Sequence, residues 1–254
     1  MIARLVAIAQ AAGAAILEHY VRGAAPRLKA DRSPVTAADE AAEALILERL
    51  GREFPEIPVV AEEAEARGLA PANVGARFFL VDPLDGTKEF VAGNGEFTVN
   101  IGLIENARPV AGVVHAPTLE ESWWAERGRA WHQAGNAAPV AIAARRPPSE
   151  GLTAMVSRSH MTAETEAFLA RLPIAARLVS GSSVKFCRIA EGRADIYPRH
   201  GPTREWDSAA AHAVLAAAGG SVRDFEGRDL SYGKPGWRNP AFVARGRGAI
   251  MAEG

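Results

Sequence analysis

Two aspartates three residues apart, Asp82 and Asp85, follow the apolar run 78–81 directly. A short apolar run bounded by turn residues indicates a buried strand. Pro83 cannot donate a hydrogen bond to a strand ladder, so we expect the chain to leave the sheet at Asp82. Two carboxylates at the end of one strand can then face a single point in space, as a pair of ligands to a cation does.

The residues after this pair favour the binding of an anion. Gly86 and Thr87 offer backbone N–H groups to a negatively charged ligand if a helical turn begins there. Carboxylates next to an anion site require a bridging cation, and Mg²⁺ takes carboxylate oxygens together with substrate phosphate. The alternative is that Asp82-Pro83 and Asp85-Gly86 are only turn formers.

Two more acidic elements stand in similar positions. Glu62 and Glu63 follow the apolar run 59–61, and Asp207 precedes the alanine-rich stretch 208–211. Each also has a simpler interpretation. The glutamates could belong to a solvated loop, and Asp207 could be the N-cap of the helix that follows.

The elements that must position these side chains begin with two helical patterns. Residues 1–20 read as an amphipathic helix, and a second helix begins at Thr36, where Asp39 completes a capping box. Short strand-like runs follow, connected by hairpin-like turns at 105–108 and 126–129, and they are residues 57–60, 78–81, 97–104, 110–115 and 122–125. Two helices followed by such a meander predict an α+β half, with an antiparallel sheet covered on one face.

The second half alternates strands and helices. Paired prolines at 147–148 block both helix and ladder, so we place the division there, giving halves of residues 1–146 and 147–254. We expect strands at 152–157, 176–179, 194–197, 222–225 and 241–244, and helices at 163–172, 183–192 and 208–218. This alternation is typical of an α/β fold.

Composition narrows the function classes. The formal net charge is −1, so no global field favours nucleic acid, and any polyanion must bind at a local site. The single cysteine, Cys187, excludes an internal disulfide and a cysteine-built metal cluster. Polar residues interrupt the N-terminal apolar pattern, so we expect no signal peptide, no transmembrane segment and a cytoplasmic location.

Taken together, the motifs resemble a known family. Glu62-Glu63, then Asp82-Pro83-Leu84-Asp85-Gly86-Thr87, then Trp206-Asp207-Ser208 resemble, in this order, the lithium-sensitive inositol monophosphatase superfamily. Within it, Lys88-Glu89-Phe90 is similar to the CysQ-type 3'(2'),5'-bisphosphate nucleotidases, since inositol phosphatases more often carry Thr-Asn before that phenylalanine. Further matching strings lie at 95–100, 157–160, 181–187 and 197–203.

The resemblance implies a layered α-β-α-β-α sandwich of the inositol monophosphatase and fructose-1,6-bisphosphatase type, with the active site between the halves. It implies two or three Mg²⁺ ions. One would be held by Glu62, Asp82 and the Leu84 carbonyl, and another by Asp82, Asp85 and Asp207. Thr87, with Glu62 or Asp39, would orient the attacking water. The capping box explains Asp39 equally well.

The resemblance also implies a substrate with two phosphates. Ser182 and Lys185 stand at the start of a predicted helix, and Arg199 can fork onto phosphate oxygens. Lys185 could otherwise be a solvated helix charge and His160 a loop histidine. The implied substrate contacts are Asp85, Gly86, Thr87, Lys88, His160, Ser182, Lys185, Arg199 and Asp207.

The sequence therefore predicts a magnesium-dependent, lithium-sensitive phosphatase that converts 3'-phosphoadenosine 5'-phosphate (PAP) to AMP and phosphate. The sulfated analogue (PAPS) is a second candidate substrate, and the family implies a role in sulfur metabolism. Two alternatives stay open: an inositol or sugar phosphatase on the same scaffold, and a non-catalytic binding protein. The resemblance also leaves a homodimer open.

Overall fold

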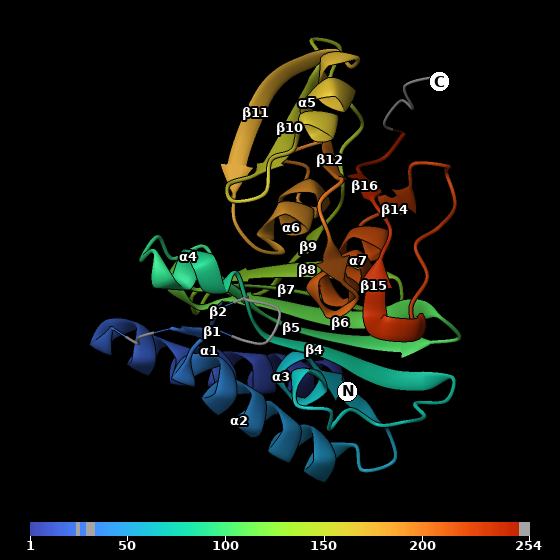
Figure 1. Cartoon of the computed structure of the whole chain (residues 1–254). Coiled ribbons are helices and arrows are strands. Elements are labelled where there is room, and N and C mark those ends of the chain that lie inside the picture. Colours follow the sequence, from blue (N-terminus) through green and yellow to red (C-terminus); the bar gives the residue numbers. More distant parts are fainter. Residues whose placement is uncertain (24–25, 29–33, 249–254) are drawn as a thin grey trace.

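The computed structural model describes residues 1–23, 26–28 and 34–248 and shows five layers, α-β-α-β-α (Figure 1). From the bottom of Figure 1 these are a helix pair, a large sheet, a second helix pair, a smaller sheet and one helix. This is the layered sandwich predicted from the sequence. The last six residues of the predicted second half, 249–254, lie outside the described residues.

Two N-terminal helices form the outer layer beneath the large sheet. They are α1 (Ile2–Arg22) and α2 (Ala37–Glu53). The predicted capping box is present at α2, because Thr36 accepts a hydrogen bond from the Ala38 amide while Asp39 accepts one from the Thr36 amide. A two-stranded ribbon, β1 (Arg27–Leu28) with β2 (Pro34–Val35), lies between them in sequence.

The sequence predicts no membrane-spanning segment, but one helix of the described residues has the length and apolar composition of such a segment. By length and mean hydropathy alone, α1 is apolar enough to cross a membrane. Its buried side chains, among them Leu5, Ile8 and Ile16, belong to the core shared with α2 and the large sheet. The apolar face of α1 is therefore accounted for by packing in this fold.

The large sheet contains, among the described residues, seven strands in chain order. They are β3 (Val59–Ala61), β4 (Arg77–Asp85), β5 (Thr98–Glu105), β6 (Arg108–Ala116), β7 (Glu121–Glu126), β8 (Arg129–Ala134) and β9 (Val140–Ile142). The predicted hairpin at 105–108 is confirmed, with Asn106 and Ala107 at positive φ. The sequence analysis missed β8 and β9, and β3 pairs with β4 in parallel rather than antiparallel.

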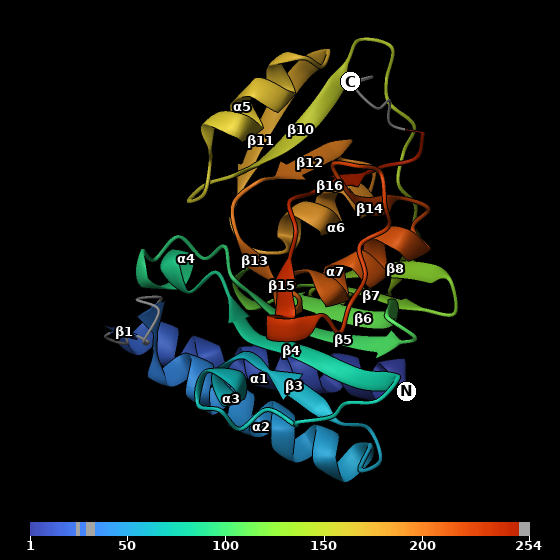
Figure 2. The same ribbon diagram turned by 45° about the vertical axis from the view of Figure 1, so that its right-hand side comes forward.

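The expectation that this sheet is covered on one face is wrong. The face away from α1 and α2 is covered by α6 (Val184–Ala190) and α7 (Trp206–Ala217), as Figures 1 and 2 show. Alternate residues of β7 contribute to the two cores, because Trp123 packs on the α6 side and Trp124 on the α1 side. The second core could not be read from the first half alone, since the second half supplies its helices.

The smaller sheet has strand order β11-β10-β12-β16-β14. β10 (Leu152–Ser157) runs parallel to β11 (Ile174–Ser180) and β12 (Ile196–Arg199), whereas β16 (Phe242–Arg245) is antiparallel to β12 and β14 (Ser221–Asp224). Helix α5 (Ala163–Ala170) forms the last layer. Each strand and helix predicted for this half is present, with ends shifted by a few residues.

A small ribbon, β13 (Thr203–Arg204) with β15 (Arg238–Asn239), was not predicted. Two short helical turns, η1 (Pro117–Leu119) and η2 (Pro235–Trp237), complete the described chain together with α3 (Glu62–Ala66) and α4 (Thr87–Val91). The division at residue 146 stays a prediction: the segment 143–148 carries neither helix nor strand.

Candidate active site

Three acidic side chains from distant parts of the sequence meet at one point. Carboxylate oxygens of Glu62, Asp82 and Asp207 all lie within 4.8 Å of one another. Glu62 is the first residue of α3, Asp82 lies in β4 and Asp207 lies in the first turn of α7. The fold thus brings together the three acidic motifs that the sequence analysis singled out.

The backbone of β4 is irregular between Asp82 and Asp85, next to the acidic group. The prediction that the strand ends at Asp82 is wrong, because pairing with β5 resumes at Asp85, opposite Thr98. The register shift between Asp82 and Asp85 accommodates Pro83, which has no N–H to donate. The Leu84 amide donates to Asp82 Oδ1 at 3.0 Å, and the Leu84 carbonyl stands outside the ladder.

Asp207 is not an N-cap, as the simpler interpretation proposed. The N-cap residue of α7 is Glu205, and Asp207 is the second residue of the helix. One Asp207 oxygen, Oδ2, accepts a hydrogen bond from the Arg204 amide at 2.9 Å. The buried Glu205 carboxylate accepts from the amides of Gly233 and Lys234, which fixes the chain where α7 begins.

The electrostatics of this group call for a cation. Burial, together with the charges of Asp85 and Glu62, raises the pKa of Asp207 well above its usual range. Burial also raises the pKa of Asp85 to about 6, although the Lys185 ammonium opposes the shift. Partly buried carboxylates that repel one another in this way fit a divalent metal, which favours hard oxygen ligands.

Thr87 and Asp39 are in contact. The Thr87 hydroxyl lies 3.2 Å from Asp39 Oδ1 and 3.2 Å from the Leu84 carbonyl oxygen. The other Asp39 oxygen accepts from the Thr36 amide at 2.8 Å and the Thr36 hydroxyl at 2.6 Å. Asp39 therefore takes part in the capping box and also contacts Thr87.

Basic side chains line the same cleft. Lys185 is buried, and its Nζ donates to the carbonyls of Ser180 and Ser182. Arg199 is buried at the end of β12 and donates to the carbonyls of Gly201 and Pro202. The expectation that Lys185 could be a solvated helix charge is therefore wrong.

His160 and Lys88 stand together at the mouth. His160 Nε2 lies 3.2 Å from Lys88 Nζ. Partial desolvation, reinforced by the charges of Arg199, Lys88 and Lys185, lowers the pKa of His160 to about 4, although the residue is exposed. Burial also lowers the pKa of Lys185 to about 8. The positive charges of this cluster repel one another, and a bound anion would relieve the repulsion. The cluster is therefore suited to bind an anion.

These groups line one cleft of about 200 Å³, together with several other residues predicted to contact the substrate. Most predicted site residues line it: Glu62, Asp85, Gly86, Thr87, Lys88, His160, Ser182, Lys185, Arg199 and Asp207. Asp82, Leu84 and Asp39 are not among the residues that line it, and each is 2% exposed.

Two side chains that hold this cleft in place were not predicted from the sequence. Glu43 of α2 is buried and accepts from the Glu63 amide at 2.7 Å, which fixes the start of α3 next to Glu62. Asn100 of β5 lies 3.4 Å from Asp85 and accepts from the Ser183 hydroxyl at 2.8 Å, so it connects β4 to the start of α6. No motif marks Glu43, and Asn100 lies in the matching string 95–100 without a role predicted for it.

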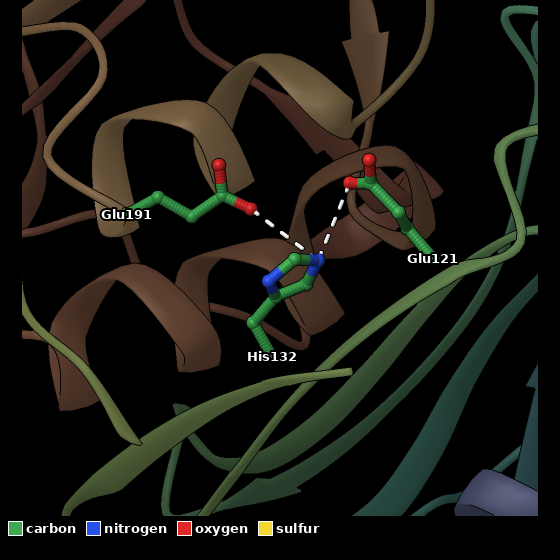
Figure 3. A group of neighbouring side chains, drawn as sticks. All are labelled: Glu121, His132 and Glu191. Carbon is green, nitrogen blue, oxygen red and sulfur yellow. Dashed lines mark ion pairs between the residues drawn. The ribbon is translucent and has the colours of Figure 1, made fainter. Parts of the chain in front are cut away.

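A second carboxylate and histidine group lies outside the residues that line the cleft (Figure 3). In it, His132 Nε2 is 3.4 Å from Glu121 and 3.7 Å from Glu191. Arg188 Nη1 already pairs with Glu121 at 2.6 Å and with Glu191 at 3.2 Å. This group connects β7 and β8 to the end of α6, and the Arg188 guanidinium supplies the positive charge that its two carboxylates need.

Comparisons with known proteins agree with this geometry. The model of the family described as "Inositol monophosphatase family" matches residues 1–252. The chain is 44% identical over 247 residues to 3'(2'),5'-bisphosphate nucleotidase CysQ of Escherichia coli K12, covering 95% of this chain and 98% of that protein.

Two solved structures are also similar. CysQ from Bacteroides thetaiotaomicron, described as a bacterial member of the inositol monophosphatase family, is 37% identical with a TM-score of 0.77, covering 94% of both chains. The extragenic suppressor protein suhB from Bartonella henselae is 26% identical with a TM-score of 0.79, covering 97% of this chain and 93% of that one.

Proposed function

The chain belongs to the inositol monophosphatase family, and from this premise we propose that it is a 3'(2'),5'-bisphosphate nucleotidase that hydrolyses PAP to AMP and phosphate. The 44% identity to CysQ across nearly the whole chain supports this substrate class. PAPS is proposed as a second substrate, because it keeps the 3'-phosphate that is cleaved.

One observation carries the proposal. A single cleft is lined both by carboxylates, Glu62 and Asp207, which group with Asp82, and by buried cations, Lys185 and Arg199. A monophosphate needs only the first of these. A substrate with two phosphates uses both, one at the metal ligands and one at the basic residues.

The enzymes of this family depend on metal ions, and the acidic group here fits them. We propose that Glu62, Asp82 and the Leu84 carbonyl would hold one Mg²⁺, and that Asp82, Asp85 and Asp207 would hold another. When bound, these ions would neutralise charge on the phosphate and activate water. The mutual repulsion of the carboxylates supports this assignment.

The protein's own residues orient the reactants. Because Thr87 donates its one hydroxyl proton to Asp39 or to the Leu84 carbonyl, its oxygen is left to accept a hydrogen bond from the attacking water. The first amides of α4, after Gly86, have no partner within the helix and face the phosphate in this proposal. Water attacks phosphorus in line as the bond between phosphorus and the ribose 3'-oxygen breaks, and the proton that the attacking water loses balances the one that the leaving 3'-oxygen gains.

The second phosphate would lie against the basic side of the cleft. We propose that Lys185, Arg199, Lys88 and His160 bind it, with Ser182 at the turn before α6. Phosphate would favour protonated His160, whose pKa is lowered in the free protein by burial and by neighbouring cations. A cytoplasmic location and a homodimer stay predictions, which fractionation and light scattering would check.

The proposal is tested by measuring phosphate release from PAP and from inositol 1-phosphate side by side, with Mg²⁺, with EDTA, and with Mg²⁺ plus Li⁺. We expect preference for PAP, no activity in EDTA and inhibition by Li⁺. Preference for inositol 1-phosphate would overturn the substrate assignment but keep the metal site. Inactivity on both would favour a non-catalytic binding protein.

A further inference from the structure

Two loops of the second half carry proposed substrate contacts and depend on contacts with the first half. The parallel strands β10 and β11 end at the same edge of the smaller sheet, and the arrow of β11 points toward α4 in Figure 1. The loop after β10 carries His160, and the loop after β11 carries Ser182 and leads to Lys185. Their positions relative to the metal ligands therefore depend on what joins them to the first half.

Glu96, in the segment between α4 and β5, contacts both loops. Its carboxylate pairs with Arg158 in a two-pronged arrangement, with Arg158 Nε at 2.9 Å and Nη2 at 2.8 Å. The same carboxylate accepts from the Gly181 amide at 2.7 Å. One side chain of the first half thus holds the residues just before His160 and just before Ser182.

A second glutamate supports the same loops. Glu89 of α4 is buried and accepts from the Ser159 hydroxyl at 2.5 Å. A Cβ placed on Gly181 would lie 2.6 Å from Glu89 Cγ and 2.8 Å from the Glu96 carbonyl oxygen. The loop after β11 therefore lies directly on both glutamates, with no room for a side chain at position 181.

From these contacts we infer that Glu96 is a positioning residue for substrate specificity: through Arg158 and Gly181 it holds the loops that bind the second phosphate of a nucleotide bisphosphate. This inference rests on the proposed function, because it assigns the second phosphate to His160 and Lys185. Glu96 itself does not touch the reacting atoms in this assignment. It acts on the affinity for the phosphate that is not cleaved.

We expect the charge of Glu96 to affect the position of the two loops more than the free energy of unfolding. Arg158 is 44% exposed and the Glu96 side chain 23% exposed, and ion pairs this accessible contribute little to folding. Arg177 and Glu166 form a comparable exposed pair at 2.8 Å elsewhere in the second half, where neither lines the cleft. Glu166→Gln is therefore a matched control for Glu96→Gln.

The experiment compares wild type, Glu96→Gln and Glu166→Gln on PAP and on adenosine 3'-monophosphate, which lacks the 5'-phosphate, with saturating Mg²⁺. For Glu96→Gln we expect KM for PAP to rise about tenfold or more while kcat changes little, since looser supporting contacts commonly cost affinity on this scale. We expect unchanged kinetics on adenosine 3'-monophosphate, and wild-type behaviour from Glu166→Gln. Arg158→Lys, which keeps the charge but loses the fork, should raise KM for PAP in the same selective way.

Each outcome bears on the inference separately from the proposed function. If wild type fails to prefer PAP over inositol 1-phosphate, the proposed function is wrong. If wild type prefers PAP and Glu96→Gln leaves its KM unchanged, or lowers activity equally on both nucleotides, the positioning role is wrong. Thermal unfolding of each variant checks folding, and should Glu96→Gln not fold, the KM of Arg158→Lys decides the question.

Discussion

At the scale of single residues, Asp39 shows how one carboxylate can serve two purposes. Its Oδ2 accepts from the Thr36 amide and hydroxyl at the start of α2, while its Oδ1 faces the Thr87 hydroxyl at 3.2 Å. The sequence analysis left helix capping and catalysis as alternatives. The contacts are compatible with both, so the two roles must be separated by changing the partners of Asp39 rather than Asp39 itself.

Replacing each partner by alanine should divide the roles. Thr36→Ala removes the hydroxyl that accepts from the Ala38 amide, and we expect a loss of about 1 kcal/mol in the free energy of unfolding with kcat nearly unchanged. Thr87→Ala should lower kcat roughly 100-fold, with little loss of stability. Chemical denaturation and steady-state kinetics measure both, and a Thr87→Ala enzyme with normal kcat would remove Thr87 from the mechanism.

The repulsion among the carboxylates gives a second prediction. In EDTA, Asp207→Asn should raise the free energy of unfolding by about 1 kcal/mol, or Tm by ~2–4 °C, because asparagine avoids the cost of either keeping a carboxylate charge beside Asp85 and Glu62 or protonating it. The amide oxygen of asparagine can still accept from the Arg204 amide. Phosphatase activity with Mg²⁺ should fall strongly.

Asp224→Asn is the control of opposite sign for this measurement. Asp224, which does not line the cleft, accepts from the amides of Glu226 and Arg228 at 3.0 and 2.9 Å besides pairing with Arg228, so its replacement should lower Tm. Calorimetry in EDTA compares the two variants. A decrease in Tm for Asp207→Asn would mean that the charges of this group do not repel one another in the metal-free protein.

At the scale of elements, close packing of α7 on the large sheet sets where Asp207 lies. Gly102 and Gly112 are partners across β5 and β6, and both face Ala210 of α7. A Cβ on Gly112 would lie 2.5 Å from the Ala210 carbonyl oxygen, and one on Gly102 would lie 2.9 Å from the Ala210 amide nitrogen. Only glycine allows the helix this close, and the alanine-rich composition of α7 completes the fit.

Gly112→Ala should therefore displace α7. Because the contacted atoms are backbone, we expect a loss of about 1–3 kcal/mol in stability. We also expect half-maximal activity to require a higher Mg²⁺ concentration, as Asp207 moves from Asp82. Gly51→Ala, in α2 with no atom within 4 Å of the added Cβ, should instead stabilise by about 0.5–1 kcal/mol. Denaturation and Mg²⁺ titration test both, and a stabilised Gly112→Ala would contradict the packing argument.

The same contacts explain how far the sequence could predict the fold. The amphipathic helices, the strands of the second half and the order of the acidic motifs follow from local patterns. The β4 register shift could not be predicted, because Pro83 equally permits a strand end or a bulge. The second covered face of the large sheet depends on α7, more than ninety residues from the Gly102–Gly112 pair in sequence.

The candidate site divides in the same way. Glu62, Asp82 and Asp207 stand in motifs and could be found from residue types and spacing. Glu43 could not, since it is an isolated glutamate whose partner, the Glu63 amide, is set by tertiary structure. Glu96 lies in the matching string 95–100, but its contact with the Gly181 amide is likewise set by tertiary structure. Side chains that hold a ligand in place leave little pattern in a single sequence.

At the scale of the whole molecule, two buried histidines couple folding to pH. His115 hydrogen-bonds Ser122 at 2.9 Å, and His212 hydrogen-bonds Tyr232 at 2.9 Å. Burial lowers the pKa of each to about 4. Between that value and the ordinary pKa of about 6.5, the unfolded chain binds protons that the folded chain does not, so stability falls as pH decreases through this window.

Each histidine should contribute a slope of up to about 1.4 kcal/mol per pH unit between roughly pH 6.5 and 4, and almost none above pH 7.5. Asp85, whose pKa burial raises to about 6, acts in the opposite direction when metal is absent, so absolute curves combine both effects. The difference between wild type and His212→Asn isolates one histidine, because Asp85 is common to both proteins. We expect the free energy of unfolding of wild type minus that of His212→Asn to decrease steadily as pH falls from 6.5 to 4, measured by urea denaturation at each pH. A difference that is constant across the window would mean that His212 is protonated equally in the folded and unfolded chains, and that its burial against Tyr232 does not couple folding to pH.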